Sequence, residues 1–326
     1  MTLTRGARIT GAVLCAVLAL ITGAWIVRDL TVADGPLDLW RFWTGAGVRG
    51  MALEPLATTL VDPLLLVVCV VTAVVVLRSS IAAAVLVAAG VITLAVRLPG
   101  LWVLSSSWMD LQATDDLRTR ALYCAFAALG LGVGLLIAAA AGRRPADADE
   151  PAPTRLGERV SVPAGVLLVA AAIVLTAWEI DAARQYRGRV EYADRFTGSE
   201  SIRLALLGTP PGWLMASIAA IAATAGVGAL TRTVSARPLG LVAGLFLTAL
   251  GGANVHTAAR HDLLTHLGDL PSREGLVVLS WLFELAAGAT ILLTLSRASP
   301  PTQETPPPPV PWSPGPPPPS TRPPGW

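Results

Sequence analysis

The segment LATTLVDPLLLVVCVVTAVVVL, residues 56–77, decides the fold class. Apart from one Asp, one Pro, one Cys and a few Thr, all of its residues are aliphatic. A helix that crosses the hydrocarbon core of a bilayer needs about 20 consecutive, mostly apolar residues. The segment therefore predicts a transmembrane helix over residues 56–77.

Seven further runs of similar length and composition accompany it. The eight runs lie at approximately residues 9–27, 56–77, 80–100, 121–141, 161–180, 213–231, 237–256 and 275–296. The first run follows two Arg residues, as the core of a signal peptide does, but no small-residue cleavage site follows it, so we expect an uncleaved helix. The sequence predicts an all-α, polytopic integral membrane protein with eight transmembrane helices.

The overall composition agrees with a membrane environment. Apolar residues make up 53% of the 326 positions and charged residues only 14%, which is more apolar than soluble domains are. The net charge of +2 is small and spread along the chain, so we expect the lipid bilayer, and no nucleic acid, as a partner. Arg is used without Lys, a bias that indicates a GC-rich bacterial genome. Cys15, Cys69 and Cys124 lie within apolar runs and predict no disulfide.

The distribution of Arg predicts the orientation. Basic residues near the ends of transmembrane segments stay on the cytoplasmic side. The short segments without acidic residues carry Arg5, Arg8, Arg78, Arg232 and Arg237, whereas the loops on the opposite side are longer and mix Arg with Asp and Glu. We therefore expect both termini in the cytoplasm and the protein in the plasma membrane of a bacterium. Five Trp residues then fall at the outer interface, as in an aromatic belt: Trp25, Trp102, Trp108, Trp178 and Trp213.

A short phrase recurs at an interval of 153 residues, since RFWTG at 41–45 is answered by DRFTG at 194–198. The same interval relates Ala24 and Trp25 to Ala177 and Trp178 and, further along, Asp116, Leu117 and Arg120 to Asp269, Leu270 and Arg273. A common shift at both ends of a four-helix block indicates a duplicated unit. Because four is an even number, both copies enter the membrane from the same side, so we expect two parallel four-helix repeats of the same topology.

The repeats divide the chain into four parts. These are a first four-helix repeat (1–142), a cytoplasmic linker (143–160), a second four-helix repeat (161–298) and a proline-rich cytoplasmic tail (299–326). The linker is charged and contains Pro, which favours a hinge or tether. The tail contains PPPPVPW and PPPPSTRPP and predicts disordered polyproline II structure. It could bind a cytoplasmic protein partner or serve as a solvated spacer.

Two predicted outer loops mix aromatic with charged residues. GPLDLWRFW (35–43) and RVEYADRF (189–196) each predict a short helix at the membrane interface. Two roles remain open for Trp40, Phe42, Trp43 and Phe196. They either cap the bundle and anchor it among lipid headgroups, which is the commoner role of such aromatics, or form a lid over a ligand.

Three ionisable residues fall within the predicted helices and form the candidate intramembrane polar site: Asp62, Arg97 and Glu284. Each costs at least about 2.5 kcal/mol at the centre of a spanning helix. Asp62 and Arg97 lie near outer helix ends, where an ion pair between neighbouring helices, or snorkelling of Arg97, would account for them. Glu284 lies near the middle of the eighth helix and is either a neutral, hydrogen-bonded carboxyl or a proton- or cation-coupled site.

Other sequence signals for a metal, catalytic or cofactor site are weak. His256, His261 and His266 are five residues apart, which turns successive rings by about 140° on a helix, so we expect no metal site. No nucleophile elbow, Walker A sequence or dinucleotide fingerprint occurs in a suitable context, so we expect no catalytic residues and no cofactor. The GxxxG patterns at Gly130–Gly134 and Gly240–Gly244 indicate close helix packing within the bundle.

Together these observations favour a non-enzymatic envelope or scaffold protein that binds partners through its outer loops and tail. The alternative is a small-solute or proton-coupled transporter with an asymmetric site near Glu284, which parallel repeats would also suit. The sequence carries no signal for the oligomeric state.

Overall fold

The computed structural model describes residues 2–45, 55–144, 156–185, 192–199, 202 and 204–297. Over these residues the chain is almost entirely helical, with eight helical segments long and apolar enough to cross a membrane, as predicted. The helices that form them are α1 (Arg5–Val32), α3 (Val61–Arg78), α4 (Ala82–Arg97) with α5 (Gly100–Val103), α6 (Asp115–Ala141), α7 (Glu158–Gln185), α9 (Pro211–Leu230), α10 (Ala236–Arg260) and α11 (Ser272–Arg297). Most of the predicted linker and the whole of the proline-rich tail 299–326 lie outside the described residues.

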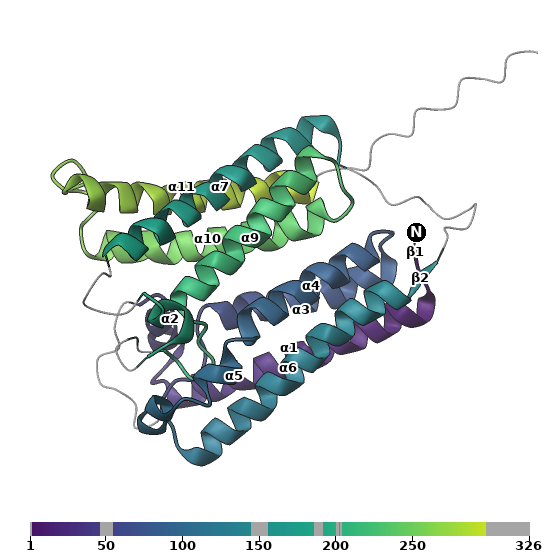
Figure 1. Ribbon diagram of the computed structural model, residues 1–326, viewed down its shortest axis with the longest axis horizontal. Coiled ribbons are helices and arrows are strands. Elements are labelled where there is room, and N and C mark those ends of the chain that lie inside the picture. The colour runs from purple at the N-terminus through teal and green to yellow at the C-terminus, as the bar shows by residue number, and fades with distance from the viewer. Residues whose placement is uncertain are drawn as a thin grey trace, which may run out of the picture.

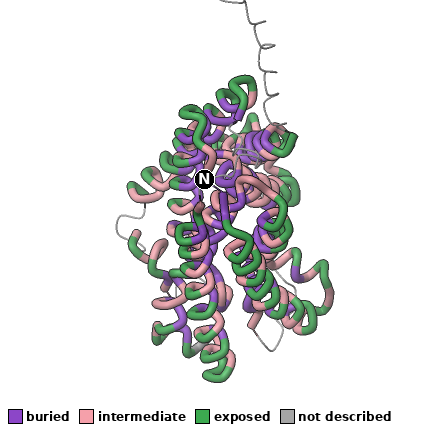
Figure 2. Tube along the Cα trace, turned by 90° about the vertical axis from the view of Figure 1, so that its right-hand side faces the viewer, coloured by how far each residue is buried: buried purple, intermediate pink, exposed green. Residues whose placement is uncertain are grey.

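The long helices form two groups of four, which Figure 1 shows side by side. In the first half, α1 and α4 each pack against α3 and α6. In the second half, α7 and α10 each pack against α9 and α11. The halves meet where α10 lies against α3 and α4 and where α4 lies against α9. The interior consists mostly of Ala, Leu and Val, and Figure 2 shows buried positions alternating with exposed ones along each helix.

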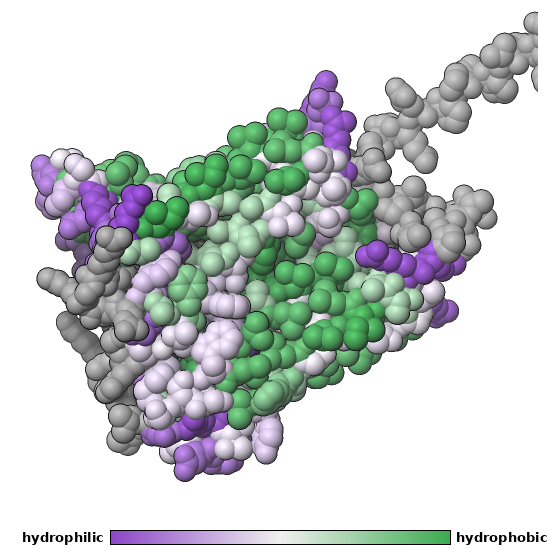
Figure 3. All heavy atoms as spheres, viewed as in Figure 1, coloured by the Kyte–Doolittle hydropathy of each residue, from purple (hydrophilic) through white to green (hydrophobic). Residues whose placement is uncertain are grey.

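Large apolar side chains also cover the outside of the bundle. Leu20 is 73% exposed, Ile173 63% and Val74 61%, and each lies within a long helix. Figure 3 shows this apolar surface as a broad band between two more hydrophilic ends. Exposing so much apolar area to water would be unfavourable, whereas hydrocarbon solvates it without cost. The band therefore identifies the surface that faces lipid.

Two of the approximately predicted spans differ in detail from the helices that form them. The second span begins at Val61 rather than at residue 56, because the backbone before it is held in a non-helical conformation by side chains described below. The third span is interrupted after Arg97, where α4 ends, and Pro99 is the N-cap residue of the short helix α5. Proline lacks the N–H that would continue the hydrogen bonds of α4.

A small sheet was not predicted. Strand β1 (Thr2–Leu3) pairs antiparallel with β2 (Arg143–Arg144), and the Thr4 N–H donates to the carbonyl of Gly142 at 2.9 Å. These contacts join the start of α1 to the end of α6. The first two residues of the predicted linker therefore belong to the first half of the bundle. We call this end of the molecule the β1 end.

The opposite end carries short helices and is called the α2 end. Helix α2 (Pro36–Trp43) and helix α8 (Asp194–Thr197) form where short helices were expected, and the 3-10 helix η1 (Ser107–Leu111) lies between α5 and α6. The two copies of the recurring phrase end in the same way. The hydroxyls of Thr44 and Thr197 donate to the carbonyl four residues earlier, and Gly45 and Gly198 follow with φ of +72° and +76°. Glycine suits this left-handed conformation because it has no Cβ.

Helices α10 and α11 approach each other closely at several glycines. A Cβ added to Gly251 would stand 2.6 Å from the backbone nitrogen of Leu285, and one added to Gly288 would stand 2.6 Å from that of Thr248. Gly244, from one of the predicted GxxxG patterns, lies in the same contact, and a Cβ added to it would stand 3.2 Å from the carbonyl oxygen of Gly288. In the other pattern, Gly130 has open space beside it. Small residues let the backbones of these two helices touch.

Candidate functional site

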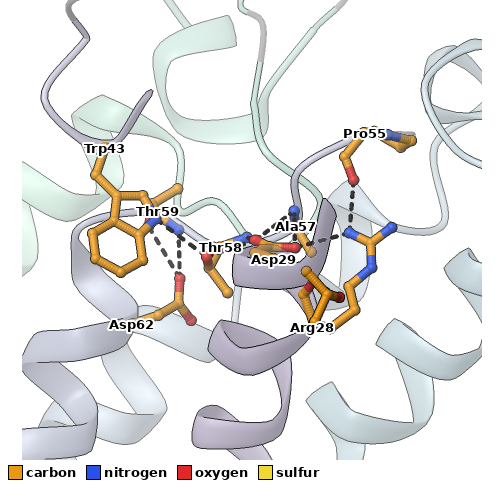
Figure 4. A network of polar contacts seen from close by, with 9 residues as sticks. Arg28, Asp29, Trp43, Pro55, Ala57, Thr58, Thr59 and Asp62 are labelled. Carbon is orange, nitrogen blue, oxygen red and sulfur yellow. Dashed lines mark hydrogen bonds and ion pairs between the residues drawn. The ribbon is translucent and has the colours of Figure 1, made fainter. Parts of the chain in front are cut away.

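A cluster of polar side chains fills the space between helices and loops at the α2 end, and Figure 4 shows most of it. The cluster, called the α2-end cluster, consists of Arg28, Asp29, Trp43, Thr58, Thr59, Asp62 and Arg97. Its two carboxylates, those of Asp29 and Asp62, are fully buried. Buried carboxylates are costly unless a positive charge and hydrogen-bond donors surround them.

Asp29, in the last turn of α1, binds the segment that precedes α3. Its Oδ2 accepts hydrogen bonds from the backbone N–H of Ala57 at 2.9 Å and of Thr58 at 2.6 Å, and from the Thr58 hydroxyl at 2.6 Å. Its Oδ1 pairs with Nη1 of Arg28 at 2.8 Å, and the same nitrogen donates to the carbonyl of Pro55 at 2.7 Å. These bonds hold residues 55–58 against the end of α1. Helix α3 begins after this segment, at Val61, five residues later than predicted.

Asp62, in the first turn of α3, has two partners. Its Oδ2 accepts from the backbone N–H of Thr59 at 2.7 Å, as an acidic residue does in a helix capping box. Its Oδ1 pairs with Nη2 of Arg97, at the end of α4, at 2.6 Å. The ion pair expected between these two predicted site residues is therefore present. It joins α3 to α4 with both side chains buried.

Trp43 extends the cluster to α2. Its Nε1 donates to the hydroxyl of Thr58 at 3.2 Å, and this hydroxyl donates to Asp29. Next to it, the carbonyl of Thr44 accepts from the hydroxyl of Thr257 in α10 at 2.8 Å. Helix α2 is thus fixed at its C-terminal end to both halves of the bundle.

The loop that leads into α9 ties the second half to the same place. The N–H of Leu207 donates to the carbonyl of Ala57 at 2.8 Å, and the hydroxyl of Thr209 donates to that of Val96 at 2.9 Å. Nε1 of Trp213 donates to the carbonyl of Ala95 at 2.7 Å, and the ring of Trp213 meets that of Trp102 edge to face. The two halves are therefore joined by hydrogen bonds at the α2 end.

The second half has a smaller polar group at the corresponding end of α7. Glu179 accepts from Nη2 of Arg195 at 2.5 Å and from the hydroxyl of Tyr192 at 3.3 Å. Burial, followed by the neighbouring Glu179 carboxylate, raises the pKa of the Tyr192 phenol, which favours the neutral form that donates this hydrogen bond. In both halves, an acidic residue near the end of the first long helix holds a following loop.

Glu284 lies apart from this cluster. It sits in α11 opposite Gly251 of α10 and is only 5% exposed. Among the described residues, no hydrogen bond or ion pair joins it to Asp62 or Arg97. The three candidate site residues thus separate into one buried ion pair and one distant carboxyl. His256 belongs to α10 while His261 and His266 follow it, and the described residues contain no group of three His, Cys, Asp or Glu side chains that could hold a metal.

The geometry of the cluster favours a structural role over a catalytic or ligand-binding role. All four oxygens of Asp29 and Asp62 already accept hydrogen bonds from protein donors, and each carboxylate has an Arg beside it. The sequence did not reveal Asp29, because it lies just after the predicted span 9–27 and its partners are 28 and 29 residues away. Its only local signal was an acid at the end of a long apolar run.

Comparisons with models of protein families, with curated proteins and with solved structures gave no match to this chain.

Proposed function

We propose that this chain is a non-enzymatic scaffold protein of a bacterial plasma membrane that binds partner proteins through its α2 end. The observation that carries the proposal is that α2 exposes large apolar side chains at the surface. On this helix Leu37 is 59% and Trp40 41% exposed, whereas Leu39 between them is buried. Exposed aromatic and aliphatic side chains on a preorganised element are typical of binding surfaces.

The α2-end cluster supplies the rigidity that such a surface needs. Trp43 holds the C-terminal end of α2 through Thr58 to the buried carboxylate of Asp29, and Thr257 holds the next residue from the other half. A surface that is already ordered loses little conformational entropy when a partner binds. In this proposal, the buried ion pairs at the α2 end therefore keep α2 in the position in which it binds a partner.

The proposal includes a duplicated architecture of two parallel four-helix repeats. Three observations support it. Helix α7 begins and ends 153 residues after α1 begins and ends. The helices of each half pack in the same order. The Thr–Gly turns after α2 and in α8 share their hydrogen bond and their left-handed glycine.

The proposed orientation has the α2 end outside the cell and the β1 end in the cytoplasm. Arg78, the last residue of α3, and Arg232, in the turn between α9 and α10, are at the β1 end, as basic residues at a cytoplasmic face would be. The proline-rich tail then extends into the cytoplasm as a second binding segment for a protein partner.

A crosslinking experiment tests the proposal. The full chain is crosslinked in intact cells, a partner is identified by mass spectrometry, and its affinity for the purified full chain in nanodiscs is measured. We expect Trp40→Ser or Leu37→Ser to weaken binding at least fivefold, because each removes an exposed apolar anchor from α2. Ile180→Ser is the matched control. Ile180 is 50% exposed and lies near the C-terminal end of α7, which is also at the α2 end of the molecule.

Two results would count against this function. Equal affinities of the α2 variants and the control would exclude α2 as the binding surface. The chain truncated after Arg297 is tested in the same way. If it no longer binds the partner while the α2 variants bind with unchanged affinity, binding belongs to the tail alone.

A small-solute or proton-coupled transporter is the second candidate function. Glu284 favours it, because this carboxyl is buried in the middle of a spanning helix and has no hydrogen bond or ion pair within the described part of the chain. Proton flux into proteoliposomes separates the two candidates. The scaffold proposal expects the same flux for the unmodified chain, for Glu284→Gln and for protein-free vesicles, whereas a flux that Glu284→Gln abolishes would establish transport.

A further inference from the structure

An apolar groove runs between the two halves towards the β1 end. Its volume is about 400 Å³, and α3, α4 and α10 form its walls together with Leu292 of α11. Only Thr72, Ser79 and Arg237 among its lining residues are polar. The hydrogen bonds between the halves described above lie at the opposite end, so the halves are joined at one end and separated by apolar space at the other.

The dimensions of the groove fit a hydrocarbon chain. Its wall on α3 extends from Val67 to Val75, which spans about 12 Å at 1.5 Å per residue. This is close to one leaflet, or half of a hydrocarbon core about 30 Å thick. The wall consists mostly of Val, Ala and Leu, so a hydrocarbon chain can lie against it along this length.

Two of the three polar residues, Ser79 and Arg237, lie where the headgroup of such a chain would be. Ser79 follows the last residue of α3, and Arg237 lies in the first turn of α10. Arg237 donates from Nε to the carbonyl of Leu295 at 3.0 Å and from Nη2 to that of Ser296 at 3.3 Å, which leaves its charge without a carboxylate among the described residues. Arg78, exposed at the end of α3, likewise has no ion pair within the part of the chain that the structure describes. This end of the groove is therefore positive.

We propose that the groove binds one acyl chain of an anionic phospholipid, with the lipid phosphate against Arg237 and Ser79. The acyl chain fills the apolar space that the packing of the two halves leaves open. A charge-assisted hydrogen bond from the guanidinium to a phosphate oxygen then selects anionic over zwitterionic headgroups. The lipid completes the contact between the halves in the leaflet at the β1 end.

Native mass spectrometry tests the site on the full chain. The protein is reconstituted in nanodiscs of equal amounts of phosphatidylglycerol and phosphatidylcholine with identical acyl chains, and the lipid retained after release is identified. We expect one retained lipid, with phosphatidylglycerol preferred at least fivefold. Arg237→Gln should reduce the preference below twofold, while Arg237→Lys and Arg232→Gln should keep it. Arg232 is the control because it lies at the same end and pairs with Glu158 outside the groove.

A second pair of variants tests the acyl-chain part without disturbing the core. Val71 lines the groove and is 52% exposed, whereas Val74 on the same helix is 61% exposed and does not line it. We expect Val71→Phe to lower retention of both lipids at least threefold and Val74→Phe to leave it unchanged. Equal retention of the two lipids by the unmodified chain would overturn the proposal. So would equal behaviour of the two Phe variants, or displacement of the lipid by soluble glycerol phosphate.

Discussion

Replacing Arg97 by Met is expected to lower the free energy of unfolding by about 3–5 kcal/mol. The substitution keeps most of the side-chain volume but leaves the carboxylate of Asp62, which is fully buried, without its positive partner. Such a carboxylate keeps its hydrogen bonds from Thr59 but has neither water nor a positive charge to stabilise its negative charge. The measurement is unfolding of the purified full chain in bicelles by steric trapping.

A double-mutant cycle distinguishes the ion pair from simple loss of packing. Asp62→Asn retains an oxygen that can accept from the Thr59 N–H, so we expect the pair Asp62→Asn with Arg97→Met to recover at least half of the loss. Arg232→Met is the control, because its ion pair with Glu158 is exposed and should contribute less than about 1 kcal/mol. Additive effects of the two substitutions would contradict the account of a coupled buried pair.

The second large effect is expected at the contact between α10 and α11. Gly251→Ala should destabilise the protein by about 1–3 kcal/mol or more, because the added methyl would stand 2.6 Å from a backbone nitrogen that cannot move away alone. Gly252→Ala is a control on the same helix, since its methyl would lie 3.7 Å from a flexible Leu285 side chain. We expect that variant to be neutral or slightly more stable, because Ala favours a helix over Gly.

The same unfolding assay measures this pair of variants. Equal stabilities of Gly251→Ala and Gly252→Ala would mean that the two helices are not in backbone contact. The result also bears on Glu284, because its Cβ lies on the side of α11 that faces Gly251. If Gly251→Ala separates α10 from α11, water should reach the Glu284 carboxyl.

The helices were predictable because each carries its own signal. A run of about 20 apolar residues is sufficient to specify a spanning helix whatever surrounds it, and the eight runs correspond to the eight long helical segments. The beginning of α3 was not predictable in this way. It depends on Asp29, which lies 32 residues before Val61 and holds the segment before the helix against α1 through the amides of Ala57 and Thr58.

The candidate site was predictable only in part for the same reason. An Asp and an Arg near the ends of adjacent spans already indicated a pair, because neither is tolerated alone in hydrocarbon. The roles of Thr58, Trp43 and Leu207 could not be read from the sequence, since each depends on where loops far apart in the chain meet. Glu284 was found from the sequence, but its location opposite Gly251 required the packing of α10 on α11.

The proposed function requires hydrocarbon around these helices and the α2 end outside the cell. Labelling with a membrane-impermeant maleimide tests this directly, in a chain whose Cys15, Cys69 and Cys124 are replaced by Ala. In intact cells Trp40→Cys should react, whereas Arg78→Cys should react only after the membrane is permeabilised. Reaction of both positions in intact cells, or of Arg78→Cys alone, would contradict the account.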